Sequence, residues 1–286
     1  MKECDLYKKE RDKVRCLACA HKCLIEKDKV GICGVRKNIN NKLYLLVYGK
    51  VASMNVDPIE KKPLYHFFPG SLAFSIGTVG CNFRCENCQN YDISQASKQG
   101  IIFGREVSPK EIVEKAIKTK CKSIAYTYNE PAIFIEFVRE ISILAKKKKL
   151  KNIWVTNGYM SKEAFDYMNG YIDAMNIDLK FFDEKMHFKI CGGKLQPVLE
   201  TIKRAHKAGI HIELTTLIIP GLNDNEKDLE KIAKFIASVD KKIPWHISRF
   251  FPMYKMLDKP ITLIDALERA YKIGKKHLEY VYIGNV

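Results

Sequence analysis

The chain has 286 residues, 47% of them hydrophobic, and a formal net charge of +16. This length and apolar content suffice for one large barrel, or for a core domain with a small extension, around a sizeable buried core. No apolar run approaches the roughly 18 uncharged residues that a membrane span needs. These features exclude a membrane-spanning chain, and we expect a cytoplasmic protein with no membrane partner.

The positive charge comes mainly from lysine. One interpretation is a polyanionic partner such as nucleic acid. We favour a solvated surface in a Lys-rich, heat-adapted protein. The lysine run 146–149 has no interleaved aromatic residues, which a single-strand binder would need. A nucleic-acid partner is thus the second interpretation of the charge, after a solvated surface.

Residues 1–70 form the first predicted unit, a Cys-rich extension followed by a linker. The unit contains one strand-like stretch, 43–47, and ends in the proline-punctuated segment DPIEKKPLYHFFPG. Regular alternation of strands and helices begins after this segment. We therefore place a domain boundary at residue 70, with a barrel domain over 71–286.

Short apolar strands alternate with helical segments through the second unit. The strand candidates are 72–80, 123–131, 152–158, 174–180, 211–221 and 245–252. The helix candidates are 108–119, 132–147, 161–168, 196–208 and 223–239. About six such alternations predict a parallel sheet with right-handed crossovers. The fold class we expect is α/β, a partial (β/α)6 TIM-like barrel with a small N-terminal Cys-rich metal-binding extension.

Polar residues lie where the predicted strands end. They are Cys81, Glu130, Asn157, Asp178, Pro220 and His246. In (β/α) barrels the carboxyl ends of the strands carry the active site. The sequence thus predicts a functional rim at this end of the barrel.

Ten cysteines fall mainly into two dense groups, which in a cytosolic chain favours metal ligation over disulfides. The second group, Cys81, Cys85 and Cys88, has the spacing Cys-x3-Cys-x2-Cys after the first barrel strand. A structural zinc site needs four ligands. Three thiolates can instead hold three irons of a [4Fe–4S] cluster and leave the fourth iron open. Three buried structural cysteines are the alternative.

This cysteine spacing resembles the signature of radical S-adenosylmethionine (radical SAM) enzymes. The resemblance implies that the methionine part of S-adenosylmethionine chelates the open iron. An electron from an external low-potential donor then releases methionine and a 5′-deoxyadenosyl radical, which abstracts hydrogen from a substrate. The protein binds and orients the cosubstrate and keeps out water.

The other rim motifs resemble those of pyruvate formate-lyase activating enzymes. TYNEP (127–131) occupies the place of a Gly-Gly-Glu-like motif, which implies that Asn129 and Glu130 meet the methionine ammonium. An acidic residue in the first turn of a helix is the alternative for Glu130. VTNG and NIDLK resemble Thr-Asn-Gly and Asp-x-Lys motifs. The resemblance implies that a monovalent cation lies beside the aspartate and that four residues line the ribose and carboxylate of the cosubstrate. These residues are Thr156, Asn157, Asp178 and Lys180.

The Asp-x-Lys motif has a structural alternative, and two more residues are candidates for the rim. An ordinary Asp–Lys ion pair is the alternative for Asp178 and Lys180. His246 and Arg249 are candidates for contact with substrate or adenosine, or are simply hydrogen-bonded rim residues.

Six segments from PIEKKPLYHFFPG to the terminal YIGN resemble the radical SAM member of the AmmeMemoRadiSam system, over nearly the whole chain. There are two departures. Asn87 replaces the aromatic residue that often precedes the third cysteine near the adenine. Relatives also tend to continue past Val286 with a Cys-containing tail, so we expect a trimmed C-terminus.

The first cysteine group has the spacing Cys16-x2-Cys19-x3-Cys23-x9-Cys33. Four thiols can close a tetrahedral site, and such a site stabilises a small segment with little apolar content. Zinc is our first choice and an auxiliary iron–sulfur cluster the second. Free cysteines packed as small apolar residues are the alternative.

We therefore predict a radical SAM enzyme with a [4Fe–4S] cluster that acts on a partner protein, as an activase does. The alternatives are radical SAM modification of RNA or of a small metabolite, and a non-catalytic iron–sulfur or zinc adaptor. An open iron argues against a simple electron carrier, which needs a fully ligated cluster. The sequence does not identify the hydrogen donor, because fold and cofactor do not determine the substrate.

Overall fold

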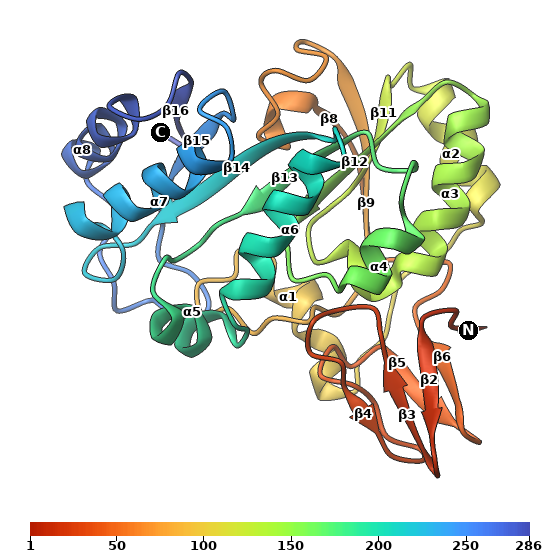
Figure 1. Cartoon of the computed structure of the whole chain (residues 1–286). Coiled ribbons are helices and arrows are strands. Elements are labelled where there is room, and N and C mark those ends of the chain that lie inside the picture. Colours follow the sequence, from red (N-terminus) through yellow and green to blue (C-terminus); the bar gives the residue numbers. More distant parts are fainter.

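The computed structural model describes residues 1–286 and is built on one eight-stranded sheet, in the order β16-β15-β14-β13-β12-β11-β9-β8. Its strands are β8 (Ser53–Pro58), β9 (Leu72–Gly77), β11 (Ser123–Tyr126), β12 (Lys151–Thr156), β13 (Ala174–Asp178), β14 (His211–Ile218), β15 (Trp245–Arg249) and β16 (Val281–Gly284). Strand β8 runs antiparallel to β9, and the remaining neighbours pair in parallel. The sheet curves without pairing β8 to β16, so the barrel is partial (Figure 1).

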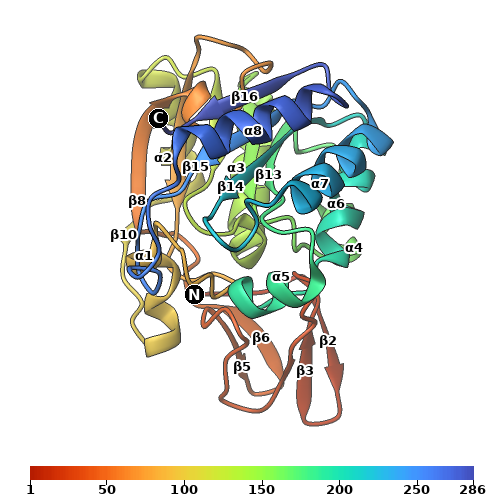
Figure 2. The same cartoon turned by 90° about the vertical axis from the view of Figure 1, so that its left-hand side faces the viewer.

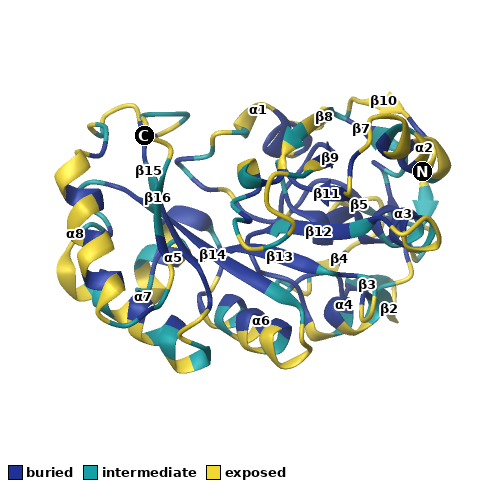
Figure 3. Ribbon diagram, turned by 90° about the horizontal axis from the view of Figure 1, so that it is seen from above, coloured by how far each residue is buried: buried dark blue, intermediate teal, exposed yellow.

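The helices follow the strands, and most of them cover the outside of the curved sheet. They are α1 (Tyr91–Ser94), α2 (Pro109–Lys118), α3 (Ile135–Lys147), α4 (Lys162–Tyr167), α5 (Glu184–Cys191), α6 (Gln196–Lys207), α7 (Glu226–Val239) and α8 (Ile264–Lys275), with 3-10 turns η1 (Ile59–Lys61), η2 (Ala96–Gln99) and η3 (Pro131–Phe134). Seen from above, their outer sides are exposed and the strands beneath them are buried (Figure 3). No helix has the length and apolar character needed to cross a membrane.

Local sequence explains where the predicted helices start. Ser108 and Glu111 form a reciprocal capping box at the start of α2, and Pro109 is its first residue. Ser161 caps α4 in the same position, through a bond from the Ala164 amide. The predicted alternation is confirmed, whereas α1, α5, α8 and the outer strands β8 and β16 were not foreseen.

The N-terminal residues form two small antiparallel sheets beside the carboxyl ends of the barrel strands (Figures 1 and 2). The first contains β1 (Lys2–Glu3), β6 (Lys42–Leu45) and β5 (Arg36–Ile39), and the second contains β2 (Tyr7–Glu10), β3 (Lys13–Cys16) and β4 (Leu24–Ile25). A short pair joins β7 (Lys50–Val51) to β10 (Arg105–Glu106). The boundary at residue 70 stays a prediction, and we note that β8, which precedes it, belongs to the barrel sheet.

The linker 59–70 fills the other end of the barrel, where the strands begin. The fully buried carboxylate of Glu213 on β14 accepts bonds from the amides of Tyr65 (3.0 Å) and His66 (2.8 Å). It also bonds the rings of His211 (2.9 Å) and His246 (2.6 Å). Burial opposes ionisation, but these four bonds outweigh it and lower the pKa of Glu213 to about 2. The linker therefore closes the base of the barrel and satisfies the Glu213 carboxylate there.

Candidate active site

A cavity of about 340 Å³ opens among the carboxyl ends of β9, β11, β12, β13 and β14. Predicted site residues line it, namely Cys81, Cys85, Cys88, Asn129, Asn157, Asp178 and Lys180. Its floor includes Lys62 and Pro63 from the linker. The predicted functional rim therefore coincides with a cavity that reaches down to the filled base.

The loop that carries the three cysteines is held tightly on both sides. At its start Gly80 has a φ of +96°, and a Cβ there would lie 2.7 Å from Val35, so only glycine fits. At its middle the amide of Arg84 donates to the Cys191 carbonyl (2.8 Å), at the end of α5. Gly193 just beyond packs on Phe83, because an added Cβ would lie 2.3 Å from that ring. The loop is thus positioned in part by residues 107 and 110 positions further along the chain.

The thiols of the loop are buried or half-buried. Burial raises the pKa of Cys81 well above its usual value. A hydrogen bond with the Cys191 thiol, together with burial, does the same for Cys85. Cys88 bonds Ser94 (3.1 Å). Sequence reasoning left Cys191 among the scattered cysteines; the adjacent glycine pair was the signal of a close approach.

Nowhere in the chain do three Cys, His, Asp or Glu side chains converge closely enough to hold a metal as they stand. The cavity nevertheless contains buried polar atoms that a bound cofactor would satisfy. Asn129 donates to the Thr78 and Gly80 carbonyls, both at 2.8 Å, which leaves its Oδ1 atom buried without a partner. The Oδ1 atom of Asn87 is likewise unpartnered. Both residues line the cavity, and a buried acceptor of this kind favours a ligand that brings donors, such as an ammonium group.

Glu130 and Thr156 lie behind the cavity wall and do not line it. The Glu130 carboxylate accepts from the Thr156 hydroxyl (2.9 Å) and from the amides of Asn157 (2.9 Å) and Ala132 (3.0 Å). Burial raises its pKa to about 7, and these bonds oppose the rise. Glu130 is thus the N-cap of η3, close to the predicted alternative of an acidic residue in the first turn of a helix. Its bond from the Asn157 amide also holds the loop after β12.

Asp178 and Lys180 form a 2.7 Å ion pair inside the cavity. Burial opposes the charge on Lys180, but Asp178 and the neighbouring Cys85 and Cys191 outweigh it and raise the pKa of the amine. Asn157 reaches across to the cluster loop, where its Nδ2 donates to Asn82 Oδ1 (2.7 Å). The structure therefore brings the Asn157 and Asp-x-Lys motifs to the same side of the three cysteines.

The expectation that His246 lies at the end of its strand is wrong. Strand β15 begins at Trp245, because Trp245 pairs in register with Leu214 and Val281. His246 is consequently near the base, against Glu213, and outside the cavity lining. Arg249 does end the strand, but its Nε donates to the Thr262 carbonyl (2.8 Å). The residue of β15 that lines the cavity is Ser248, which no motif had suggested.

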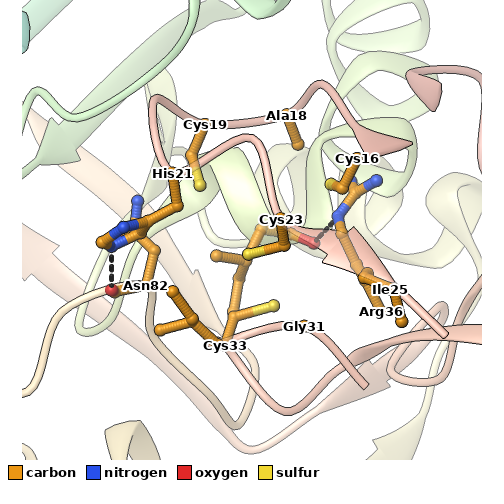
Figure 4. Close-up of a pocket in the computed structure, with 12 residues that line it drawn as sticks. Cys16, Ala18, Cys19, His21, Cys23, Ile25, Gly31, Cys33, Arg36 and Asn82 are labelled. Atoms are coloured by element: carbon orange, nitrogen blue, oxygen red, sulfur yellow. Dashed lines mark hydrogen bonds between the residues drawn. The ribbon is translucent and has the colours of Figure 1, made fainter. Parts of the chain in front are cut away.

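The four N-terminal cysteines line a second, much smaller cavity of about 10 Å³ (Figure 4). Its lining also includes His21, Arg36 and Asn82. Asn82 belongs to the cluster loop, so the two cysteine groups are separated by little more than this residue.

Comparison with known proteins identifies the family of this chain. The description "Radical SAM superfamily" matches residues 75–236, and the chain belongs to this superfamily. It is 46% identical to the uncharacterized protein MJ0808 of Methanocaldococcus jannaschii over all of this chain and 86% of that protein. A pyruvate formate-lyase-activating enzyme of Staphylococcus epidermidis is 23% identical over 62% of this chain and 76% of its own.

The fold comparison agrees. A crystal structure of a domain of pyruvate-formate lyase-activating enzyme from Bacteroides vulgatus superposes with a TM-score of 0.50 at 21% identity. The match covers 57% of this chain and 99% of that domain. Membership of the superfamily implies a [4Fe–4S] cluster and S-adenosylmethionine, and the radical SAM partial barrel is confirmed.

Proposed function

We propose that the chain is a radical SAM enzyme in which Cys81, Cys85 and Cys88 hold a [4Fe–4S] cluster. When bound, the cluster and S-adenosylmethionine supply reductive cleavage, in which one electron from an external low-potential donor yields methionine and a 5′-deoxyadenosyl radical. The observation that carries the proposal is the cavity where three cysteines meet unpartnered buried acceptors at the mouth of a partial barrel.

The chain's own residues would bind and orient the cosubstrate. Asn129 Oδ1 would accept from the methionine ammonium, since its amide nitrogen is already held by the loop carbonyls. Asn157 and the Asp178–Lys180 pair would face the ribose and carboxylate, with Glu130 and Thr156 holding Asn157 in place. With the cosubstrate bound, the cavity walls would shield a reactive carbon radical from water.

For the substrate we propose a partner protein, as the chain's likeness to a pyruvate formate-lyase-activating enzyme suggests. RNA modification is the second candidate, and the net charge of +16 is the observation that favours it. RNA binding whose affinity does not fall between low and physiological salt would contradict an electrostatic footprint.

The test is release of 5′-deoxyadenosine from S-adenosylmethionine by anaerobically reconstituted protein with dithionite. We expect release by the wild type and by Cys121→Ala, whose cysteine lies at the far end of β11, outside the cavity. Cys85→Ala should reduce release to background. Release that survives Cys85→Ala would remove the proposed function.

A further inference from the structure

The four N-terminal cysteines come from three separate stretches and line one small cavity. Cys16 ends β3, Cys19 and Cys23 follow in the loop before β4, and Cys33 comes from the turn before β5. All four line the same cavity, and Figure 4 shows them arranged around it. No other cysteine lines it, although Cys4 is buried in the same extension.

Burial raises the pKa of all four thiols, and the contacts around them oppose that rise. A backbone amide stabilises the charged form of each sulfur: Ala18 for Cys16, His21 for Cys19, Ile32 for Cys23 and Val35 for Cys33. The buried Arg36 guanidinium lies beside Cys16 in Figure 4. It also pairs with Glu136 (2.5 Å), which the figure does not draw. Amides and a guanidinium stabilise negative sulfur, and such contacts around a metal site orient its ligands.

The size of the cavity distinguishes between the metals that four thiols could hold. Its volume of about 10 Å³ is room for about one water-sized atom. A single tetrahedral ion needs about this much room, because Zn–S bonds are about 2.3 Å long, and the cysteine side chains would rotate toward it, since they do not converge as they stand. A cubane cluster, with four irons and four sulfides, would require the loops to separate.

We infer that the four-cysteine cavity is a tetrathiolate site for one zinc ion, and that this ion braces the two loops that carry the active-site residues. The brace depends on contacts made by the cysteine-bearing loops themselves. They reach both the cluster loop and the loop that follows β12.

On the cluster loop, His21 Nε2 bonds the Asn82 carbonyl (2.9 Å). On η2, just beyond this loop, the Ser97 hydroxyl donates to the Cys33 carbonyl (2.8 Å). An added Cβ on Gly80, the residue before Cys81, would lie 2.9 Å from the Cys33 carbonyl. The residues just before and after Cys81 thus touch the metal-bearing turn.

On the loop after β12, Cys19 forms a β-bridge with Met160, and the Ala20 amide donates to the Tyr159 carbonyl (3.0 Å). Ser161 donates to the Leu17 carbonyl (2.5 Å). This loop also contains Asn157, so the ion would tie together the cluster loop and the Asn157 loop through one small fold.

Metal content tests the site in the full chain carrying Cys81→Ala, Cys85→Ala and Cys88→Ala, which has no cluster ligands. Grown with both iron and zinc, this parent should hold about one zinc per chain and almost no iron by mass spectrometry. Adding Cys16→Ser and Cys19→Ser should lower zinc at least about fivefold, whereas adding Cys4→Ser should leave it unchanged. Iron as the main metal, or zinc that survives the double change, would overturn the inference. Because the parent lacks the cluster ligands, failure here leaves the proposed function untouched.

A second measurement covers the case in which the double variant does not fold. Cobalt(II) exchanged into the parent should give the intense charge-transfer absorption of a tetrathiolate site. Removing the zinc from the parent with a chelator should increase amide hydrogen exchange in 80–82 and 159–161, but not in α6. Cobalt without thiolate absorption would overturn the site, and unchanged exchange in both loops would overturn the brace.

Discussion

The two ends of the barrel use the same sheet in opposite ways. At the base, the buried carboxylate of Glu213 receives four hydrogen bonds. At the mouth, Asn87 and Asn129 keep unpartnered acceptors beside three cysteines and a cavity. Buried polar groups that are satisfied stabilise a fold, whereas unsatisfied ones are tolerated where a ligand completes them. The difference separates residues that hold the barrel together from residues that serve chemistry.

The largest expected effect is a loss of activity after a change at the mouth, without a loss of folding stability. Cys88→Ala should reduce 5′-deoxyadenosine release to background, because the cluster loses one of three ligands. The free energy of unfolding of the cluster-free protein should change by less than about 1 kcal/mol, since Cys88 is only half-buried. Anaerobic turnover and urea unfolding measure the two quantities. A variant that turns over normally would place Cys88 outside the cluster.

The next largest effect is a lower free energy of unfolding after a change at the base. Glu213 has a pKa of about 2 in the folded protein against an ordinary value of 4.5, so its ionisation contributes roughly 3 kcal/mol to stability above pH 4.5. This contribution is lost as the pH falls from about 4.5 toward 2. Glu213→Gln should therefore cost about 3 kcal/mol at pH 7 and progressively less in acid.

Urea unfolding at pH 7 and at pH 3 measures this difference. His211 and His246 face the same carboxylate, so His246→Gln is the control, and it should lower stability by a smaller amount. An equal cost of Glu213→Gln at both pH values would mean that the carboxylate is not ionised in the folded protein.

The smallest effect concerns an unpartnered acceptor. Asn129→Ala removes the Oδ1 atom and the two bonds to the cluster loop, and should raise KM for S-adenosylmethionine about tenfold, the equivalent of one lost charged hydrogen bond. Asn55→Ala is a matched control, since Asn55 is an exposed asparagine on β8 outside the cavity. Unchanged KM in the Asn129 variant would assign the acceptor to another ligand group.

Sequence reasoning predicted the parts of the fold that short-range patterns determine. Alternating apolar strands and capped helices such as α2 depend on neighbouring residues, and the spacing of Cys81, Cys85 and Cys88 is itself local. The same reasoning placed Asn157, Asp178 and Lys180 at the cavity, because parallel strands bring their carboxyl ends to one edge.

The remainder depends on partners far away in the chain. The position of His246 depends on the register between β14 and β15, and the role of Glu213 on amides 147 and 148 residues earlier. Cys191 meets Cys85 only because α5 folds back along the cluster loop. No local periodicity reports such contacts, so the sequence could not distinguish His246 at the base from a residue at the rim.

The linker and β8 also bear on dissection of the molecule. A fragment that begins after residue 70 would keep the barrel helices but lose β8. Strand β9 would then be an exposed edge of the sheet, and its unpaired amides and carbonyls could pair with other chains. The fragment would lose the Tyr65 and His66 amides as well, and the Glu213 carboxylate would face an open hole. Such a fragment is expected to aggregate, and a shortened form of this enzyme should begin before Ser53.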